Sequence, residues 1–497
     1  MIESATWAAL YLFDPVHLAL LAGAVIMGIV VGSAPGLTST MAIGLLLPLT
    51  FGVDKYISFI LMLGIYCGAI YGGSITAILF NIPGTPTAAV TALDGYPLAK
   101  KGEGGKALGV ATLSSTLGGL FSCLVLVTLS THLAKIAVAF GSAEYLTLTI
   151  FALCVVFSLA SKSILKGLAS TALGLMLGCI GMDPIAQSPR FTFGLFELMV
   201  GIPLVPATIG MFCVAEAFRI AEQPELKIQK QLALSGISSA LKLFPRLWKT
   251  ILRSSGIGVL IGVLPGTGAM MASFMAYGEA KRNSKTPEKF GEGEIEGVCA
   301  SESANNAVTG GAMVPLLSLG IPGDPNTLMM LGAMTVQGLI PGPILFKEES
   351  QLLYVIFGSL ILANLLILPL GLYLCQYFAK AAQLNRKYLM PIVAVLSITG
   401  ASIGYGHIYY FWISVIFGIL GYFLSKGGFS VLAVALGLML GPTMERYLRS
   451  LFMMPNNEWL GLLLKPIPLL FILGSVLVIF FGVYKNGKGQ IKQASVS

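Results

Sequence analysis

The chain has 497 residues, of which 56% are hydrophobic and 10% are charged, and its formal net charge is +8. Soluble proteins carry roughly a quarter charged residues, so this composition excludes an ordinary soluble fold and indicates that the lipid bilayer surrounds most of the chain. The positive charge does not indicate nucleic-acid binding, because the basic residues are scattered among short loops and form no basic face interleaved with aromatic residues.

The first long apolar run, residues 16–34, is expected to be a retained membrane helix. The residues before it contain no Lys or Arg, whereas a cleaved signal begins with a positively charged region. Further long apolar runs follow at 56–80, 107–130, 143–160, 164–181, 199–220, 255–277, 298–320, 351–378, 388–403, 408–424, 428–441 and 466–484. We therefore predict an all-α integral membrane protein with about 12 transmembrane helices. Two shorter runs, 37–51 and 327–340, are predicted to be half-helices or re-entrant arms.

A polar segment at 222–253 divides the chain near its middle and carries more basic than acidic residues. An excess of Lys and Arg favours the cytoplasmic side of a membrane. We expect a first transmembrane repeat over 1–221, this basic cytoplasmic linker over 222–253, a second transmembrane repeat over 254–450, and an extra C-terminal helix with a basic tail over 451–497. The seven cysteines include no CxxC pair and are interpreted as small packing residues.

An internal repeat is the most informative pattern. The stretch GSAPGLTSTM at 32–41 returns as GVLPGTGAMM at 262–271. The stretch YGGSITAILFNIPGTP at 71–86 returns as TGGAMVPLLSLGIPGDP at 309–325, one residue longer. Any one Gly-Pro match would be weak, but their shared order indicates two homologous halves.

A third match and the distribution of charge extend the repeat. GLMLG at 174–178 is repeated letter for letter at 437–441. If the N-terminus, which has acidic but no basic residues, lies outside and the basic linker lies inside, the first half crosses the bilayer an odd number of times. Two such halves would be inverted relative to each other, so we expect inverted repeats with broken helices.

Each half contains two Pro-Gly elements, which are expected to interrupt helices. Proline lacks a backbone N–H, and glycine adopts backbone angles that other residues avoid. The four pairs are Pro35-Gly36, Pro83-Gly84, Pro265-Gly266 and Pro322-Gly323. A single pair would more often be a kink or a packing glycine, whereas matching pairs in both halves favour a transport site.

The start of a half-helix after such a break suits a carboxylate, because bare N–H groups point outward with the positive end of the helix dipole. Hydroxyl and amide side chains nearby can donate further hydrogen bonds without the cost of burying a cation. The expected substrate-binding residues are Pro35, Gly36, Thr38, Asn81, Pro83, Gly84, Thr85, Pro265, Gly266, Thr267, Asn306, Pro322, Gly323 and Thr327.

Three positions of the second half are candidates for ion coupling: Glu302, Asn305 and Asp324. Asn305 and Asp324 are also the expected ligands of a sodium ion, because hard cations take oxygen ligands. Glu302 is equally consistent with a helix-capping residue. Asp94, in LDGYP, is expected to shape a turn. No nucleotide-binding or catalytic-metal motif is present, so we expect no cofactor other than a coupling ion.

Five stretches carry a resemblance to a known family: GSAPGLTSTMAIGLLLPLTF at 32–51, YGGSITAILFNIPGTPTAAVTALDGYPLAKKGEGGKALG at 71–109, RFTFG at 190–194, GVLPGTGAMMASFMAYGEAKRNSKTPEKFGEGEIEGV at 262–298 and ESANNAVTGGAMVPLLSLGIPGDPNTLMMLGAMTVQGLIPGPILF at 302–346. From about residue 16 to about residue 450, the chain resembles the large membrane subunit of the tripartite tricarboxylate transporters, the TctA-type proteins. It departs from the family at Ser301, where proline is frequent, and in the Leu-Met-Met that follows Thr327, where smaller residues are usual.

The resemblance implies secondary transport of a di- or tricarboxylate, a citrate-like anion, into a bacterial cytoplasm, driven by sodium ions or protons. It also implies a multi-pass position in the bacterial inner membrane and two partners, a small membrane subunit and a periplasmic solute-binding protein. A stand-alone organic anion channel is the alternative. An intramembrane enzyme with Glu302 and Asp324 as paired acids is disfavoured, because no second Asp in a matching helix completes a dyad, so no enzymatic activity is expected.

Overall fold

The computed structural model describes residues 2–159, 163–183, 185–223, 237–378, 386–455 and 458–494. Within these ranges the chain is almost entirely helical. The two strands there, β1 (Gly181–Met182) and β2 (Pro189–Arg190), form one short antiparallel hairpin. The structure thus agrees with the predicted all-α class. The middle of the expected basic linker, residues 224–236, lies outside the described residues.

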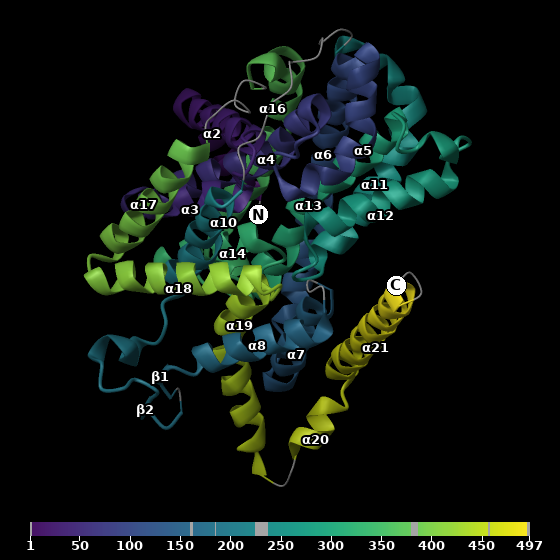
Figure 1. Cartoon of the computed structure of the whole chain (residues 1–497). Coiled ribbons are helices and arrows are strands. Elements are labelled where there is room, and N and C mark those ends of the chain that lie inside the picture. Colours follow the sequence, from purple (N-terminus) through teal and green to yellow (C-terminus); the bar gives the residue numbers. More distant parts are fainter. Residues whose placement is uncertain are drawn as a thin grey trace. The chain divides into compact units, whose positions relative to one another are not determined.

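The helices form two compact units, and each unit contains segments from both halves of the sequence (Figure 1). Unit 1 comprises Met1–Lys135, Ile220–Val263 and Gly268–Val393. Unit 2 comprises Ile136–Arg219, Leu264–Thr267 and Ala394–Ser497. Each half of the chain therefore contributes its first part to unit 1 and its later part to unit 2.

The elements of unit 1 follow the order expected from the apolar runs, with additions. They are α1 (Ile2–Leu12), α2 (Pro15–Ser33), α3 (Ser39–Leu46), η1 (Leu47–Gly52), α4 (Lys55–Phe80), η2 (Pro86–Ala88), α5 (Ala89–Leu98), η3 (Ala99–Glu103), α6 (Gly104–Ala137), η6 (Ile237–Leu243), α11 (Phe244–Val263), α12 (Gly268–Asn283), η7 (Pro287–Lys289), α13 (Ile295–Leu319), α14 (Pro325–Val336), α15 (Pro343–Glu348), α16 (Ser350–Phe378) and the start of α17 (Arg386–Tyr405).

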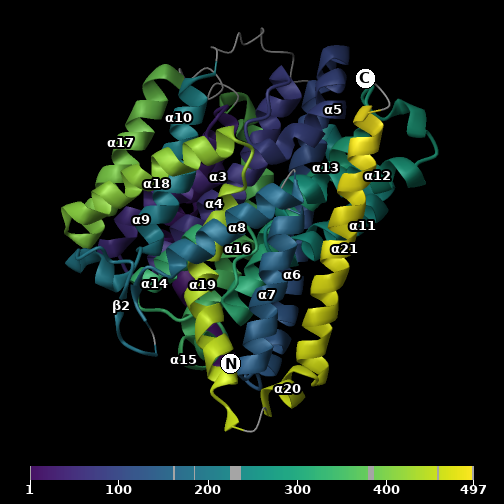
Figure 2. The same ribbon diagram turned by 60° about the horizontal axis from the view of Figure 1, so that its bottom comes forward.

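Unit 2 contains the β-hairpin and a second set of helices. They are α7 (Ser142–Leu159), α8 (Ile164–Gly178), η4 (Phe196–Val200), α9 (Leu204–Ile209), η5 (Gly210–Val214), α10 (Ala215–Ala221), most of α17, α18 (Ile408–Lys426), α19 (Val431–Phe452), α20 (Glu458–Leu463) and α21 (Pro466–Ala494). The additional C-terminal helix, α21, packs along α7 (Figure 2).

Nine helical runs in the described part of the chain are long and apolar enough to cross a membrane. The count of about 12 is therefore not confirmed. Three further apolar helices are shorter, at Ser39–Gly52, Ile164–Gly178 and Leu389–Tyr405. The predicted span at 255–277 is wrong, because the chain breaks between α11 and α12 at the Pro265-Gly266 turn.

Unit 1 is built from two copies of one helix pair, α2 on α4 and α11 on α13. A Cβ placed on Gly28 would lie 2.5 Å from the carbonyl oxygen of Ile65, and a Cβ on Gly258 would lie 2.5 Å from the carbonyl oxygen of Ala304. Gly258 follows Gly28 by 230 residues and Ala304 follows Ile65 by 239, which are the offsets of the first two sequence repeats. The repeat is therefore also a repeat of close helix packing, which small residues permit in membranes.

The same packing corrects the alignment of the second repeat. A Cβ on Gly72 would overlap the carbonyl oxygen of Ile29, and a Cβ on Gly311 would lie 2.9 Å from the carbonyl oxygen of Val259. Gly72 thus corresponds to Gly311, at the offset of 239 that also relates the two Pro-Gly pairs. The extra residue inferred for the second copy is not needed, because the two GG dipeptides are not equivalent in space.

The two copies in unit 1 also contact each other through the short helices that follow their breaks. Helix α3 of the first copy contacts α14 of the second, and α12 of the second copy contacts η2 and α5 of the first. Helix α12 is the counterpart of α3, and α14 is the counterpart of η2 and α5. These contacts are therefore reciprocal, as in a contact with two-fold symmetry.

Unit 2 shows a reciprocal contact between the two GLMLG segments. A Cβ on Gly174 in α8 would overlap the carbonyl oxygen of Val434, and a Cβ on Gly437 in α19 would lie 2.7 Å from the carbonyl oxygen of Thr171. The residues exchange roles at the constant offset of 263, so the two copies pack on each other through the same surface. Parallel and inverted repeats can both show two-fold contacts, so the inverted orientation stays a prediction.

Replacing either glycine of this reciprocal contact should destabilise the protein. Gly174→Ala and Gly437→Ala each insert a methyl group against a carbonyl of the facing helix, and such overpacking costs about 1–3 kcal/mol. Thermal unfolding of the detergent-solubilised protein should show a lower Tm for each variant.

Gly256→Ala in α11 is the matched control, since no atom lies within 4 Å of its added Cβ. Alanine is the better helix former by about 0.5–1 kcal/mol, so this variant should unfold at the same or a higher temperature. A Tm for Gly174→Ala equal to that of Gly256→Ala would contradict the packing described.

Candidate functional site

The Pro-Gly pairs after α2 and α11 form the same turn. Gly36 has φ 97° and Gly266 has φ 80°, values in the left-handed region that favours glycine. In each turn the residue after the glycine donates a backbone hydrogen bond to the carbonyl before the proline, at 3.1 Å in the first copy and 3.5 Å in the second. Both helices therefore end where the sequence predicted a break. The turn at Pro265-Gly266 belongs to unit 2, whereas the other three belong to unit 1.

The breaks after α4 and α13 are a second matched pair. Each helix ends on a left-handed residue, Asn81 at φ 56° and ψ 29° and Gly320 at φ 73° and ψ 19°. The next N–H bonds back to a carbonyl six residues earlier, at 3.4 Å and 3.2 Å. These bonds satisfy carbonyl groups at the helix ends, as glycine-type C-caps do. Asn81 is exposed at its helix end.

After each of these breaks the chain turns back along the helix it has left. Gly84 comes so near the carbonyl oxygen of Gly32 that a Cβ would overlap it, and a Cβ on Gly323 would lie 2.7 Å from the carbonyl oxygen of Gly262. Only glycine permits this approach of two backbones. The next residue, Thr85, then lies against Gly73 in the middle of unit 1.

The half-helix starts of α3 and α14 are capped by their own side chains. Thr38 Oγ1 accepts a hydrogen bond from the Met41 N–H at 3.2 Å at the start of α3. Asp324 Oδ1 accepts the N–H of Thr327 at 2.8 Å at the start of α14, and the Thr327 hydroxyl completes a capping box. At the starts of α3 and α14, one backbone N–H is therefore already bonded, whereas bare amides were expected there. At η2, Thr85 makes no such cap, and its hydroxyl lies 3.0 Å from that of Thr87.

The carboxylate of Asp324 is also held from outside its own helix. Its Oδ2 accepts hydrogen bonds from the Tyr66 hydroxyl at 2.8 Å and from Asn326 Nδ2 at 2.9 Å. The Thr40 hydroxyl of α3 in turn donates to Asn326 Oδ1 at 2.9 Å. The contact between α3 and α14 thus includes a polar hydrogen bond, and Asp324 links the break after α13 to α4.

Glu302, in the middle of α13, is completely buried. Its carboxylate accepts hydrogen bonds from the Ser115 hydroxyl of α6 at 2.9 Å and from the Thr91 hydroxyl of α5. It therefore lies inside the helix rather than at its start, and it does not cap α13, whose N-cap is Glu294. A carboxylate at this depth, with neutral donors around it, is the type of group that usually serves a function in membrane proteins.

Asn305 and Asn306 follow on α13 and are also completely buried. Asn305 Nδ2 donates to the carbonyl of Ile70 in α4 at 3.5 Å. Its Oδ1, and both polar atoms of the Asn306 amide, have no hydrogen-bond partner among the described residues. Burying an unpaired amide costs about 1–3 kcal/mol on the evidence of protein mutations, so such groups call for a partner.

Helix α4 brings these parts together. Tyr66 donates to Asp324 after the α13 break, the Ile70 carbonyl accepts from Asn305, and Gly73 lies against Thr85 after the α4 break. Residues 66 and 73 are separated by about 10 Å along a helix that rises 1.5 Å per residue. The two breaks therefore reach α4 within two turns of each other, on either side of the buried amides.

One polar contact corrects the sequence analysis. Asp94 does not shape a turn but lies inside α5, completely buried. Its Oδ1 accepts three backbone N–H groups, from Gly291, Gly293 and Glu294, each at 2.8 Å, and its Oδ2 accepts the Tyr277 hydroxyl at 2.8 Å. This carboxylate fastens α5 of the first copy to the segment that starts α13 of the second.

Other site residues were missed because their partners are distant in the chain. Tyr66 and Ser115 lie in apolar runs, where a hydroxyl is usually a packing residue, and Thr91 lies between two such runs; no local pattern distinguishes any of the three. The spacing GEGE at 291–294, just before a helix, was the one available signal for the amides that hold Asp94.

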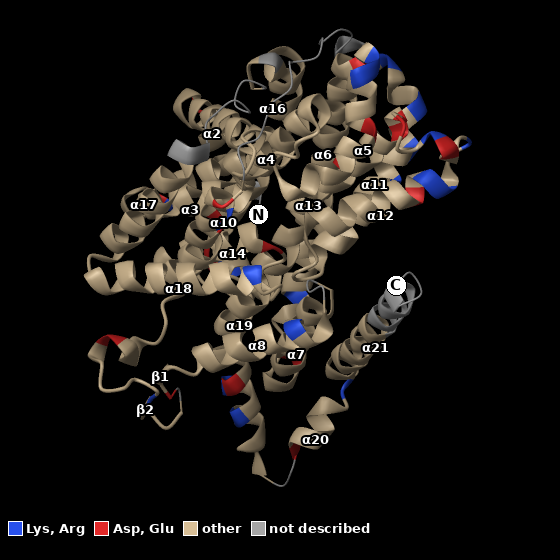
Figure 3. Cartoon of the chain, in the orientation of Figure 1, with Lys and Arg blue, Asp and Glu red and all other residues tan. Residues whose placement is uncertain are grey.

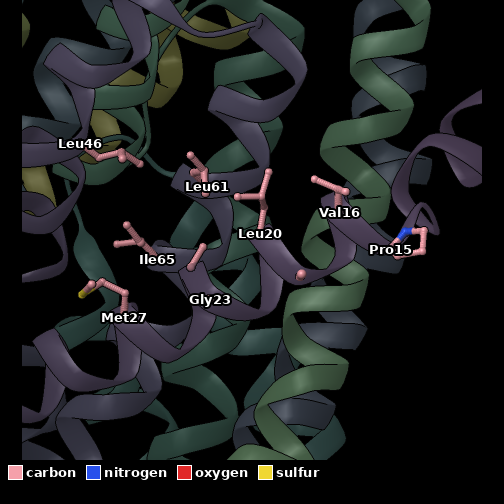
Figure 4. A pocket seen from close by; sticks show the side chains of 10 residues that line it. Pro15, Val16, Leu20, Gly23, Met27, Leu46, Leu61 and Ile65 are labelled. Carbon is pink, nitrogen blue, oxygen red and sulfur yellow. The ribbon is translucent and has the colours of Figure 1, made fainter.

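A large apolar groove in unit 1 is a different kind of surface (Figure 4). It has a volume of about 720 Å³ and is lined by side chains such as Leu20, Met27, Leu46 and Ile65 from α2, α3 and α4. None of its lining side chains offers a hydrogen-bond donor or a charge, so it cannot hold a carboxylate. In Figure 3 the charged residues gather at the ends of α5, α11 and α12, and the long helices are mostly uncharged.

Removing the Asp94 carboxylate should destabilise unit 1 strongly. Asp94→Ala leaves three amide donors and a hydroxyl without their acceptor, at about 1–3 kcal/mol for each buried donor. Asp94→Asn keeps one carbonyl oxygen for the three amides and should be much milder. Thermal unfolding in detergent should therefore rank the Tm as wild type, Asp94→Asn and Asp94→Ala, in falling order. Equal Tm values for the two variants would show that the three amides do not depend on this acceptor.

Comparison with known proteins gives the following matches. The family described as "Tripartite tricarboxylate transporter TctA family" matches residues 18–436. An Agrobacterium vitis protein described as "Uncharacterized 52.8 kDa protein in TAR-I ttuC' 3'region" is 38% identical over 443 residues, which cover 89% of this chain and 88% of the relative.

Two other relatives match a smaller part of the chain. The Agrobacterium vitis "Uncharacterized protein in TAR-II ttuC' 3'region" is 35% identical over 210 residues, 42% of this chain and 87% of the relative. An uncharacterised protein of Methanocaldococcus jannaschii is 26% identical over 227 residues, 44% of this chain and 55% of the relative. No solved structure matches the chain.

Proposed function

Because the chain belongs to the tripartite tricarboxylate transporter TctA family, we propose that it is the large membrane subunit of a secondary active transporter that imports a di- or tricarboxylate across the bacterial inner membrane. The family is one of transporters, which agrees with the expectation that the chain is not an enzyme. Its partners in this proposal are a small membrane subunit and a periplasmic solute-binding protein that delivers the substrate.

The convergence of two duplicated helix breaks on α4 is the observation that carries the proposal. A break in a membrane helix is tolerated where protein or a watery cavity meets the freed backbone groups. Here the breaks lie on either side of Asn305 and Asn306, whose buried amides keep unpaired polar atoms. Repeated breaks around a polar centre are the arrangement in which transporters bind substrate.

The substrate carboxylates would be held by neutral donors. Candidates are Asn306 Nδ2 and the hydroxyls of Thr85 and Thr87. Amide and hydroxyl donors of this kind can hold an anion without a buried cation. Binding of this kind stays weak enough for release on the far side, because no fixed positive charge neutralises the substrate.

Coupling would use the oxygen atoms of the same region. The unpaired Oδ1 atoms of Asn305 and Asn306 are ligands of the type that a hard cation such as sodium takes. Glu302, one turn earlier on α13, is the candidate for coupling to a proton. Asp324 would contribute by holding the break after α13 in place, since its oxygens already accept hydrogen bonds from Tyr66, Asn326 and Thr327.

Alternating access would follow from the two homologous halves if they are inverted in the membrane. One part of the repeat pair would then move against the other around the site and open it to each side in turn. A stand-alone anion channel is the alternative, and it would conduct without saturation and without an ion gradient.

Removal of the Asn306 amide should strongly reduce uptake. Asn306→Ala takes away a buried donor and a buried acceptor at the centre of the proposed site. Uptake of labelled citrate, malate and tartrate into proteoliposomes, with the periplasmic protein and an imposed sodium or proton gradient, should fall by about tenfold or more, as the loss of one or two hydrogen bonds to a charged ligand predicts.

Asn283→Ala is the matched control, because Asn283 is an exposed asparagine at the end of α12 that bonds only within its own helix. It should transport normally. Wild-type uptake by a correctly inserted Asn306→Ala would remove Asn306 from the site, and uptake that neither saturates nor needs a gradient would favour the channel.

The break after α13 can be tested separately. Asp324→Asn retains a good helix cap but presents an amide to donors that now bond a carboxylate, and Pro322→Ala relaxes the turn before it. Each variant should insert in the membrane and lose uptake in the same assay. Normal uptake by both variants would leave Asp324 as a helix cap alone.

A further inference from the structure

Unit 2 contains a cavity of about 430 Å³ that the proposed transport site in unit 1 does not use. Its walls are Gly178 and residues 180–182, residues 199–202, and the part of α19 from Leu438 to Arg446. Three charged side chains line it, Arg190 from β2 and Glu445 and Arg446 from α19. Its volume lies within the usual range of small-molecule sites, about 300–1,000 Å³.

Four charges beside the cavity neutralise one another. The Arg190 guanidinium bonds both oxygens of Glu445, at 2.7 Å and 2.9 Å, and lies 3.4 Å from Asp183. Arg449 bridges the same two acids, at 2.7 Å to Glu445 and 2.8 Å to Asp183. The N–H groups of Ala186 and Ile185 lower the pKa of Asp183 to about 2, so its carboxylate stays charged. Two acids and two arginines thus leave no net charge.

Arg446 then gives the cavity a net positive charge. It is exposed, and no acid lies within 4 Å of it among the described residues. A second donor is also free, because Arg190 Nε is buried and has no hydrogen-bond partner in the described structure. The cavity therefore contains one unpaired cation and one unpaired N–H, and an anion would satisfy both.

We propose that this cavity is a second anion-binding site, which takes the carboxylate of a small solute or the phosphate of a lipid headgroup. Both ligands offer oxygen acceptors to the Arg446 guanidinium and to Arg190 Nε. This site is independent of the proposed transport site, since all of its residues belong to unit 2.

The rim of the cavity distinguishes the two sources. Val200, which lines the cavity, is 90% exposed, and Phe191, Phe193 and Phe196, in the segment between the lining residues Arg190 and Met199, are 63%, 83% and 78% exposed; we call these four side chains the rim. A lipid would place its acyl chains on this apolar rim, whereas a small carboxylate would leave it uncovered.

Cys179 provides a local readout. It lies between Gly178 and Ile180, which line the cavity, and it is half-exposed, whereas the other six cysteines are buried. The rate at which N-ethylmaleimide alkylates Cys179, located by mass spectrometry, should report whether the cavity is occupied. The protein would be reconstituted in nanodiscs, and the rate followed as sodium citrate or inorganic phosphate is added, and in phosphatidylcholine against phosphatidylglycerol.

We expect an anion to slow the alkylation, and Arg446→Gln to raise the concentration needed for half-protection by about tenfold, as the loss of a charged hydrogen bond predicts. Arg282→Gln, which removes the same charge from an exposed position of α12, should leave it unchanged. Citrate or phosphate protection that depends on Arg446 indicates a solute site, and Arg446-dependent protection by phosphatidylglycerol alone indicates a lipid site.

Two results would overturn the proposal. One is an alkylation rate that no anion and no lipid changes. The other is protection that Arg446→Gln leaves intact, which would place the bound anion elsewhere, for example in unit 1. Neither result bears on the uptake defect expected of Asn306→Ala, so the two proposals fail separately.

Discussion

Every backbone N–H and C=O that the bilayer surrounds must find a hydrogen-bond partner, and this requirement governs how the helices of this protein are arranged. An unbroken helix meets this need by itself, but a helix that stops inside the membrane requires partners from elsewhere in the chain. At the breaks after α4 and α13, left-handed caps and returning backbone satisfy the helix ends. The breaks can therefore exist only where protein or a water-filled cavity meets the freed groups, and polar side chains lie beside them in unit 1.

Close packing by small residues makes these surroundings possible. In a bilayer no hydrophobic force draws helices together, so contact area and backbone proximity matter more. Gly28, Gly258, Gly174 and Gly437 all lie where an added methyl group would meet a carbonyl of the facing helix. The same contacts occur in both copies of the repeat, at constant offsets. The two halves are thus intertwined, and each unit is completed by segments from both.

The polar centre of unit 1 is built almost without positive charge. Glu302, Asn305 and Asp324 are surrounded by hydroxyl, amide and backbone groups, and among the described residues no basic side chain pairs with Glu302 or Asp324. A site of this kind holds an anion by several neutral donors, which favours reversible binding. The cavity beside Arg446 uses the opposite arrangement, an unpaired cation at a partly open surface.

The membrane class, most helix positions, the duplication and the places where helices break can all be predicted from the amino-acid sequence. These features depend on local properties: apolar run length, proline and glycine chemistry, and the order of short motifs. The exact helix count could not be read in this way: the run at 298–320 counts as apolar by its ends, yet α13 carries Glu302, Asn305 and Asn306 and is not among the nine helical runs apolar enough to cross a membrane in the described part of the chain. Likewise, the run at 255–277 is apolar throughout, and only its Pro-Gly pair divides it.

Which residues contact one another is visible in the folded chain and not in its sequence. The contacts of Asp94 with amides about 200 residues later, of Tyr66 with Asp324, and of Thr91 and Ser115 with Glu302 join segments that no periodicity relates. The fold also decided that Asp324 caps a helix and that Asn306 keeps unpaired atoms, since both depend on how α4, α13 and α14 pack. That packing determines which residues distant in the sequence form hydrogen bonds, and no pattern within a single sequence shows which ones they are.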